Sequence, residues 1–197
     1  MTTLSNTVSL AADNQRLAAL LRESRERFLL SLADVSEESC LHRPSSGCWS
    51  VLDCAEHVAV TETFMLGLLK GPRRPRSADA PNREQIFLER VANRSSKVAA
   101  PERAHPSGRF PTLHAARKLF ETSRAGAILF AEQNNEDLRR TEVPHSLFGE
   151  VSAYELLIIM AKHAERHAAQ IEEIRNRPAF TKAQSPGASA EKDLCQT

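Results

Sequence analysis

Two histidines four residues apart, His163 and His167, are the side chains of this sequence best suited to bind a metal ion. On a helix, which turns by about 100° per residue, they lie on one face together with Leu156, Met160 and Ile174. That face is apolar, so both imidazoles point towards the expected core. Leaving a buried polar group unpaired costs about 1–3 kcal/mol, so the two imidazoles need partners. A shared divalent ion would satisfy both rings, and the alternative is a pair hydrogen-bonded to each other or to the backbone.

A third histidine, His57, flanks the apolar face of an earlier predicted helix. At a rise of about 1.5 Å per residue, it lies roughly 10 Å after the start of its helix, while His163 and His167 lie roughly 15–21 Å before the end of theirs. Antiparallel packing would bring the three to similar heights. Three neutral imidazoles would leave a tetrahedral ion one position for water or substrate, as in catalytic zinc sites. Ala164 follows His163, so the HExxH pattern of zinc proteases is absent.

Three further residues have a predicted role beside these histidines. Glu62 projects into the centre of the apolar face of its helix, where a carboxylate is rarely buried without a charge partner. Two alternatives have equal weight. Either Glu62 lies near a cation site and handles protons in catalysis, or it forms an ion pair with an arginine from another helix. Gln170 shares the histidine face and is predicted to orient a ligand or to bind substrate. His145 is predicted to reach the mouth of the pocket from a loop, with a surface position as the alternative.

Helical periodicity predicts the elements that must position these residues. Ser50 with Asp53, and Ser152 with Glu155, form capping-box patterns ahead of two of the apolar runs, and Pro178 ends the last one. No segment alternates as a half-buried strand would, so the predicted fold class is all-α. The predicted helices cover residues 14–32, 51–69, 84–93, 113–134 and the segment from 152 to Pro178.

The second and third long helices are separated by a connection of about 40 residues. Such a length suits a crossover between parallel helices of a four-helix bundle. One domain over residues 1–178 is expected, followed by a polar tail, 179–197, that is expected to be disordered.

Composition excludes several other classes of function. The formal charge is +1, from 26 basic and 25 acidic residues, so there is no electrostatic footprint for nucleic acid. No run approaches the roughly 18 apolar residues of a membrane span, and the N-terminus lacks a secretory pattern, so a cytoplasmic location is expected. The cysteines form no CxxC pair and are predicted to be free thiols. Cys54 lies three residues before His57 and could approach a metal, although core packing is the favoured interpretation.

Two segments of the sequence resemble the signature segments of the DinB-like superfamily. The first, WSVLDCAEHVAVTE, covers residues 49–62, and the second, HAERHAAQI, covers residues 163–171. A histidine-and-glycine segment before the last helix, HSLFG at residues 145–149, is also typical of the family. The resemblance extends from about Leu17 to Arg177.

The resemblance implies a four-helix bundle with an up-down-down-up course and a site for zinc, nickel or iron at His57, His163 and His167. Characterised relatives include transferases that attach a low-molecular-weight thiol to electrophiles and an isomerase that uses mycothiol, whereas many members have no known activity. The expected function is therefore divalent-metal binding, with metal-dependent thiol S-transfer to small electrophiles. A non-catalytic metal-binding stress-response protein and a hydrolase that uses bound water are the alternatives, so enzyme activity stays open. A small-molecule substrate is the expected partner, without nucleic acid or membrane, and a homodimer stays open.

Overall fold

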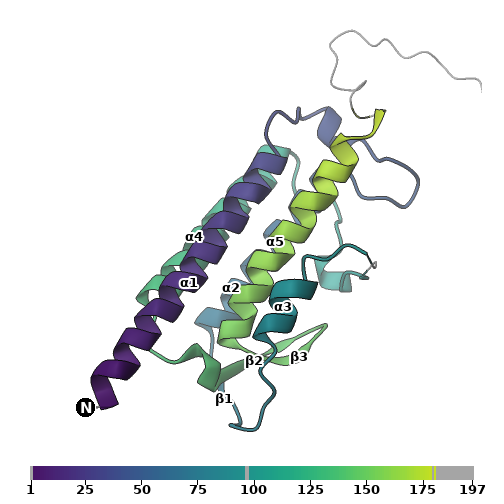
Figure 1. Ribbon diagram of the computed structural model, residues 1–197. Helices are drawn as coiled ribbons and strands as arrows, with labels where there is room; N and C mark the ends of the chain where they lie inside the picture. Colours follow the sequence, from purple (N-terminus) through teal and green to yellow (C-terminus); the bar gives the residue numbers. More distant parts are fainter. Residues whose placement is uncertain (1, 96–97, 179, 181–197) are drawn as a thin grey trace, which may run out of the picture.

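The computed structural model of the chain describes residues 2–95, 98–178 and 180. Over these residues the fold is mostly helical, with three short 3-10 turns between the longer elements (Figure 1). The α-helices are α1 (Thr2–Ser31), α2 (Val51–Lys70), α3 (Glu84–Arg90), α4 (Leu113–Gln133) and α5 (Ala153–Arg175), and the 3-10 turns are η1 (Ser39–Leu41), η2 (Glu102–Ala104) and η3 (Leu138–Arg140).

Each of the four long helices packs against two others: α1 and α2 each contact both α4 and α5. The two predicted capping boxes are present and set the helix starts of α2 and α5. The Ser50 hydroxyl accepts the Asp53 N–H while the Asp53 carboxylate accepts the Ser50 N–H, and Ser152 and Glu155 repeat this exchange. The register of both helices, and with it the direction of every side chain on them, is therefore fixed from their first turn.

The expectation of an all-α fold is wrong in one respect, because a small antiparallel sheet closes one end of the helices. Its strands, in spatial order, are β1 (Arg74–Pro75), β2 (Thr141–His145) and β3 (Gly149–Ser152). Pro144 lies within β2 and weakens the strand pattern, since proline cannot donate to a ladder. It is tolerated because β1 pairs only with the first two residues of β2. Gly149 adopts a φ of 67° and allows the tight return into β3.

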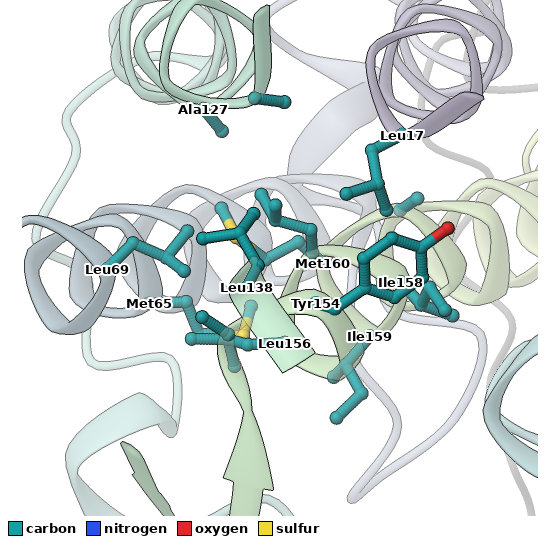
Figure 2. Packing of buried hydrophobic residues seen from close by; sticks show 14 of the residues in the cluster. Leu17, Met65, Leu69, Ala127, Leu138, Tyr154, Leu156, Ile158, Ile159 and Met160 are labelled. Carbon is teal, nitrogen blue, oxygen red and sulfur yellow. The ribbon is translucent and has the colours of Figure 1, made fainter. Parts of the chain in front are cut away.

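Two apolar clusters form the core along the helices. In the first, Leu17 of α1, Leu69 of α2, Ala127 of α4 and Met160 of α5 converge with residues of the β2–β3 hairpin (Figure 2). The second cluster lies beyond the histidines and includes the tilted ring pair of Phe28 in α1 and Phe120 in α4, whose centroids are 4.5 Å apart.

Phe180 belongs to this second cluster although it falls in the predicted tail. Its side chain is 1% exposed and packs just past Pro178, so the packed part of the molecule includes residue 180. The remaining positions of the expected tail lie outside the described residues.

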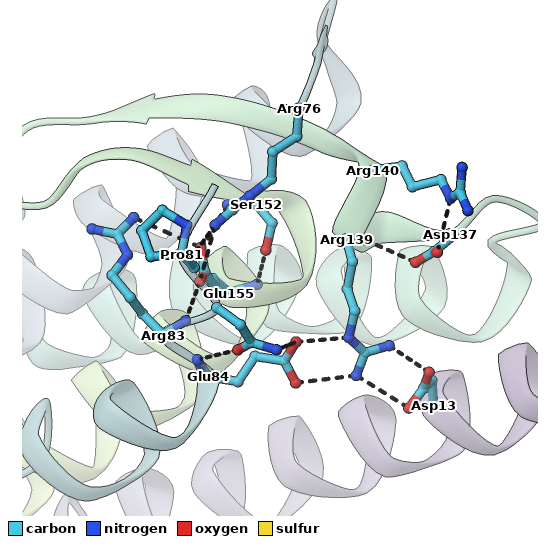
Figure 3. Close-up of polar contacts among 11 residues, drawn as sticks. Asp13, Arg76, Pro81, Arg83, Glu84, Asp137, Arg139, Arg140, Ser152 and Glu155 are labelled. Carbon is cyan, nitrogen blue, oxygen red and sulfur yellow. Dashed lines mark hydrogen bonds and ion pairs between the residues drawn. The ribbon is translucent and has the colours of Figure 1, made fainter. Parts of the chain in front are cut away.

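A network of ion pairs fastens the sheet end of the molecule to the helices (Figure 3). Arg76, after β1, donates to the Glu155 carboxylate at the start of α5, and Arg83 donates its backbone N–H to the same carboxylate. Arg139 of η3 bridges Glu84 of α3 and Asp13 of α1. These contacts fix the long α2–α4 connection and the sheet against α5, eight residues ahead of His163.

Among the described residues, no helix has both the length and the apolar character required to cross a membrane.

Candidate metal centre

Three imidazoles from two helices meet between α2 and α5. His57 comes from the second turn of α2, and His163 and His167 come from successive turns of α5. One ring nitrogen of each lies within 4.8 Å of the other two. His57 and His167 are buried, at 4% and 6% exposed, and His163 is partly buried. The structure thus brings together the three residues that the sequence indicated as metal ligands.

Hydrogen bonds to the far nitrogen orient two of these rings. His57 donates from Nδ1 to the carbonyl oxygen of Ala104 at 2.7 Å, which leaves its Nε2 without a proton in the neutral ring. The Nδ1 of His167 lies 2.9 Å from the Oε1 of Gln170, an acceptor, so the Nε2 of His167 also offers a lone pair. Gln170 therefore contacts one of the three histidines, and its role in orienting a ligand or binding substrate stays a prediction.

His57 and His163 approach each other through their Nε2 atoms. Their Nε2 atoms are 3.0 Å apart, and because His57 presents a bare Nε2, His163 must donate there if the two share a hydrogen bond. The Nδ1 of His163 is then a buried nitrogen with no hydrogen-bond partner among the described residues. Three neutral imidazoles at these distances fit a divalent ion, which zinc-type sites bind at about 2.0–2.1 Å from each nitrogen. The donor set suits zinc, nickel and iron alike.

Burial keeps these histidines neutral. It lowers the pKa of His57, and it lowers the pKa of His163 and His167 well below the ordinary value, with the neighbouring histidines acting in the same direction. Neutral imidazole is the form that binds a metal, so the site is prepared for an ion at neutral pH.

A loop after α3 covers the centre and is held by a residue that the sequence reasoning did not single out. Glu56, 1% exposed, accepts the backbone N–H groups of Ser107 and Arg109 and pairs with the Arg109 guanidinium at 2.7 Å. This carboxylate presents the loop so that the carbonyl of Ala104 meets His57. In the sequence, this role of Glu56 was indicated only by its place directly before His57 in the segment 49–62. No sequence pattern indicated that Ala104 would contact His57.

Trp49 forms another wall of the centre. Its indole ring stacks on His167 with centroids 6.0 Å apart and lies 4.9 Å from the ring of His57. The ring of His105 packs against the same indole at right angles, with centroids 5.7 Å apart. Trp49 therefore packs against two of the three histidines and shields them from solvent on one side.

Glu62 has a partner elsewhere in the bundle. Its two oxygens accept from Nε and Nη2 of Arg124 in α4, at 2.5 and 3.0 Å, and both side chains are completely buried. This is the arginine partner of one of the two alternatives drawn from the sequence. The positive charge of Arg124 still reaches the centre, where it helps to lower the pKa of His163.

His145 and Cys54 take different places around the centre. His145, in β2, is half-buried. Burial is the main cause of the lowered pKa of His163, and the electrostatic interaction with His145 acts in the same direction. The expected position of His145 at the mouth of a pocket stays a prediction. Cys54 packs in the second apolar cluster, where burial raises the pKa of its thiol. Cys40, Cys48 and Cys54 are free, and Cys195 lies outside the described residues.

The sequence is similar to that of a known protein family. The sequence profile of the DinB superfamily matches residues 20–171, a span that contains all three histidines. YuaE, an uncharacterised protein of Bacillus subtilis strain 168, is 25% identical over 162 residues, which cover 81% of this chain and 97% of that protein.

Proposed function

Because the chain belongs to the DinB superfamily, we propose that it holds one divalent ion at His57, His163 and His167 and acts as a metal-dependent thiol S-transferase on small electrophiles. The observation that carries the proposal is the convergence of three ring nitrogens within 4.8 Å, two of them oriented by hydrogen bonds from the opposite side of the ring. With three protein ligands, a four-coordinate ion keeps a position for an exchangeable group, which is typical of catalytic sites.

A bound divalent ion would lower the pKa of a thiol, or of water, placed beside it, and so supply a nucleophile at neutral pH. The residues of the chain do the positioning. Ala104 and Gln170 hold two ligand rings in place, and Trp49 limits access of solvent from one side.

The proposed reaction needs no reactants other than the thiol and the electrophile. The thiol loses its proton and its sulfur bonds to the electrophilic carbon. In a chloronitrobenzene-type acceptor the carbon–chlorine bond breaks and chloride leaves with the electron pair. In an epoxide the carbon–oxygen bond breaks and the oxygen takes up a proton.

The scaffold in this proposal is a four-helix bundle with an up-down-down-up course. Contacts between the helices support this course. Helices α2 and α4 run parallel, as Thr63–Ser123 and Leu66–Gly126 indicate, and so do α1 and α5, as Arg27–Glu165 and Ser31–Arg175 indicate. Helices α1 and α4 run antiparallel, as Asn14–Asn134 and Arg22–Glu132 indicate.

The test is a panel of thiols against acceptors. Glutathione, bacillithiol and mycothiol are each combined with chloronitrobenzene-type and epoxide acceptors, using metal-loaded wild type, His57→Ala and His114→Ala. His114 is an exposed residue of α4 and serves as the matched control. We expect at least one pair to react faster with wild type and His114→Ala than with buffer, and at the buffer rate with His57→Ala. Equal rates for all three proteins and buffer across the panel would contradict thiol transfer and favour a non-catalytic metal protein or a hydrolase.

A further inference from the structure

Among the residues that the structure describes, Arg103 lies on the loop that leads to the proposed centre and forms no ion pair with a carboxylate. The guanidinium carbon of Arg103, in η2, is 4.0 Å from the centroid of the Phe64 ring. Phe64 follows His57 by seven residues, two turns along the same side of α2. Arg103 also directly precedes Ala104, whose carbonyl accepts from His57. Both ends of this arginine are therefore tied to the helix surface that carries a ligand.

The charge of Arg103 is available to a ligand. Among the described residues, no carboxylate forms an ion pair with it, whereas Arg109 in the same loop is paired with Glu56. A guanidinium that stacks by its face on an aromatic ring keeps the N–H donors at its edge for a carboxylate or phosphate. Stacking also restricts the side chain before any ligand binds, which reduces the ordering cost of binding.

His145 interacts electrostatically with Arg103 and offers a neutral donor. Its ring stacks on Phe148 at 4.8 Å, and its Nδ1 accepts the backbone N–H of Leu147. The proton of the neutral ring therefore resides on Nε2. Burial, followed by the charges of Arg103 and Arg83, lowers the pKa of His145 to about 4, so the ring stays neutral at pH 7. The region around Arg103 thus combines a fixed cation with a neutral histidine.

We propose that Arg103 binds a carboxylate or similar acidic group of the molecule that reacts at the histidine centre, so that the site selects anionic substrates. This inference rests on the proposed function and adds the substrate class to it. The acidic group can belong to the thiol or to the acceptor, and the experiment separates these two sources.

The experiment measures binding at equilibrium to the cobalt-loaded protein. Absorption bands of bound cobalt(II) report the binding of 3-mercaptopropionate, which is anionic, and of 3-mercaptopropan-1-ol, its neutral counterpart. Calorimetry measures benzoate against benzyl alcohol as acidic and neutral compounds without a thiol. The proteins are wild type, Arg103→Met, Arg103→Lys and Arg140→Met. The side chain of Arg140 is 85% exposed, so Arg140→Met removes the same charge at another place on the surface and serves as the control.

We expect wild type and Arg140→Met to bind the acidic member of at least one pair about tenfold more tightly than the neutral member, the effect of about one charge-assisted hydrogen bond. Arg103→Met should abolish this preference without changing the affinity for the neutral compound, and Arg103→Lys should retain part of it. A preference confined to the thiols assigns the acidic group to the thiol, and one confined to benzoate assigns it to the acceptor.

The two proposals fail in different ways. If both thiols bind the cobalt protein with equal affinity and benzoate binds no better than benzyl alcohol, anion selection by Arg103 is wrong while the thiol site stands. If neither thiol changes the cobalt bands but benzoate binding depends on Arg103, the thiol chemistry is wrong and the anion site stands. A preference that survives in Arg103→Met would also overturn the role of Arg103.

Discussion

The guanidinium of Arg124 and the carboxylate of Glu62 form a bidentate ion pair inside the bundle, with both side chains 0% exposed. Arg124 comes from α4 and Glu62 from α2. The same guanidinium donates to the carbonyl oxygens of Leu21 in α1 and Met160 in α5 and to the hydroxyl of Ser24. A single side chain therefore links all four long helices, three residues along α5 from the first ligand histidine.

Replacement of Arg124 by methionine should destabilise the fold strongly. The Glu62 carboxylate would remain buried without a partner, a defect that typically costs about 3–5 kcal/mol. Urea unfolding of the metal-free protein measures the loss. The double variant Glu62→Leu/Arg124→Met removes both charges and should recover much of the lost stability. A double variant no more stable than Arg124→Met would contradict this role of the pair.

Glu62→Gln tests whether this carboxylate also handles protons. A catalytic role would require one of its oxygens to leave Arg124 during the reaction. If Glu62 acts in this way, Glu62→Gln should lower the rate of thiol transfer more than it lowers metal content, both measured per folded molecule. A lower unfolding free energy with an unchanged rate would instead assign Glu62 to the ion pair alone.

Bound metal should raise the melting temperature without being required for folding. Its ligands come from two helices that are distant in sequence, and an ion at a hundredfold excess over its dissociation constant stabilises the folded state by about 2.7 kcal/mol. For a domain of this size, that corresponds to roughly 5–10 °C. The apolar clusters provide a core of their own, so the chelated protein should keep its helical circular dichroism. Loss of helical signal on chelation would contradict this expectation.

His145 should make stability dependent on pH in the acidic range. Its folded pKa of about 4 lies below the ordinary value of 6.5, so between these values the unfolded chain binds a proton that the folded protein does not. Its contribution is therefore fully present above pH 6.5 and is lost as the pH falls towards 4. The unfolding free energy of chelated wild type minus that of His145→Gln should decrease over this interval. Both proteins contain His57, His163 and His167, so the subtraction removes most of the titration of these three residues. A difference independent of pH would be evidence against a buried, neutral His145.

Local chemistry made most of the helical scaffold predictable. Ser50 with Asp53 and Ser152 with Glu155 determine two helix starts through contacts three residues apart, and the structure contains both boxes. The spacing of His163 and His167 likewise places both on one helix face. Such patterns can be read from sequence because the interacting groups are close in the chain.

The parts that could not be predicted depend on contacts between distant residues. Strands β2 and β3 are short, and Pro144 masks the alternation of β2. The carbonyl of Ala104 reaches His57 because Glu56 binds the backbone of the same loop at Ser107 and Arg109, about fifty residues away in sequence. The choice between the two roles of Glu62 likewise depended on Arg124, 62 positions further along the chain.

The most direct test of the metal centre is the metal content of protein purified without chelators, measured by elemental analysis. Wild type should carry close to one first-row divalent ion per chain. His163→Ala should lose most of it, because two remaining imidazoles bind a divalent ion far more weakly than three. His114→Ala, an exposed histidine on α4, should keep the wild-type content. Full metal content in His163→Ala would contradict the proposed three-histidine site.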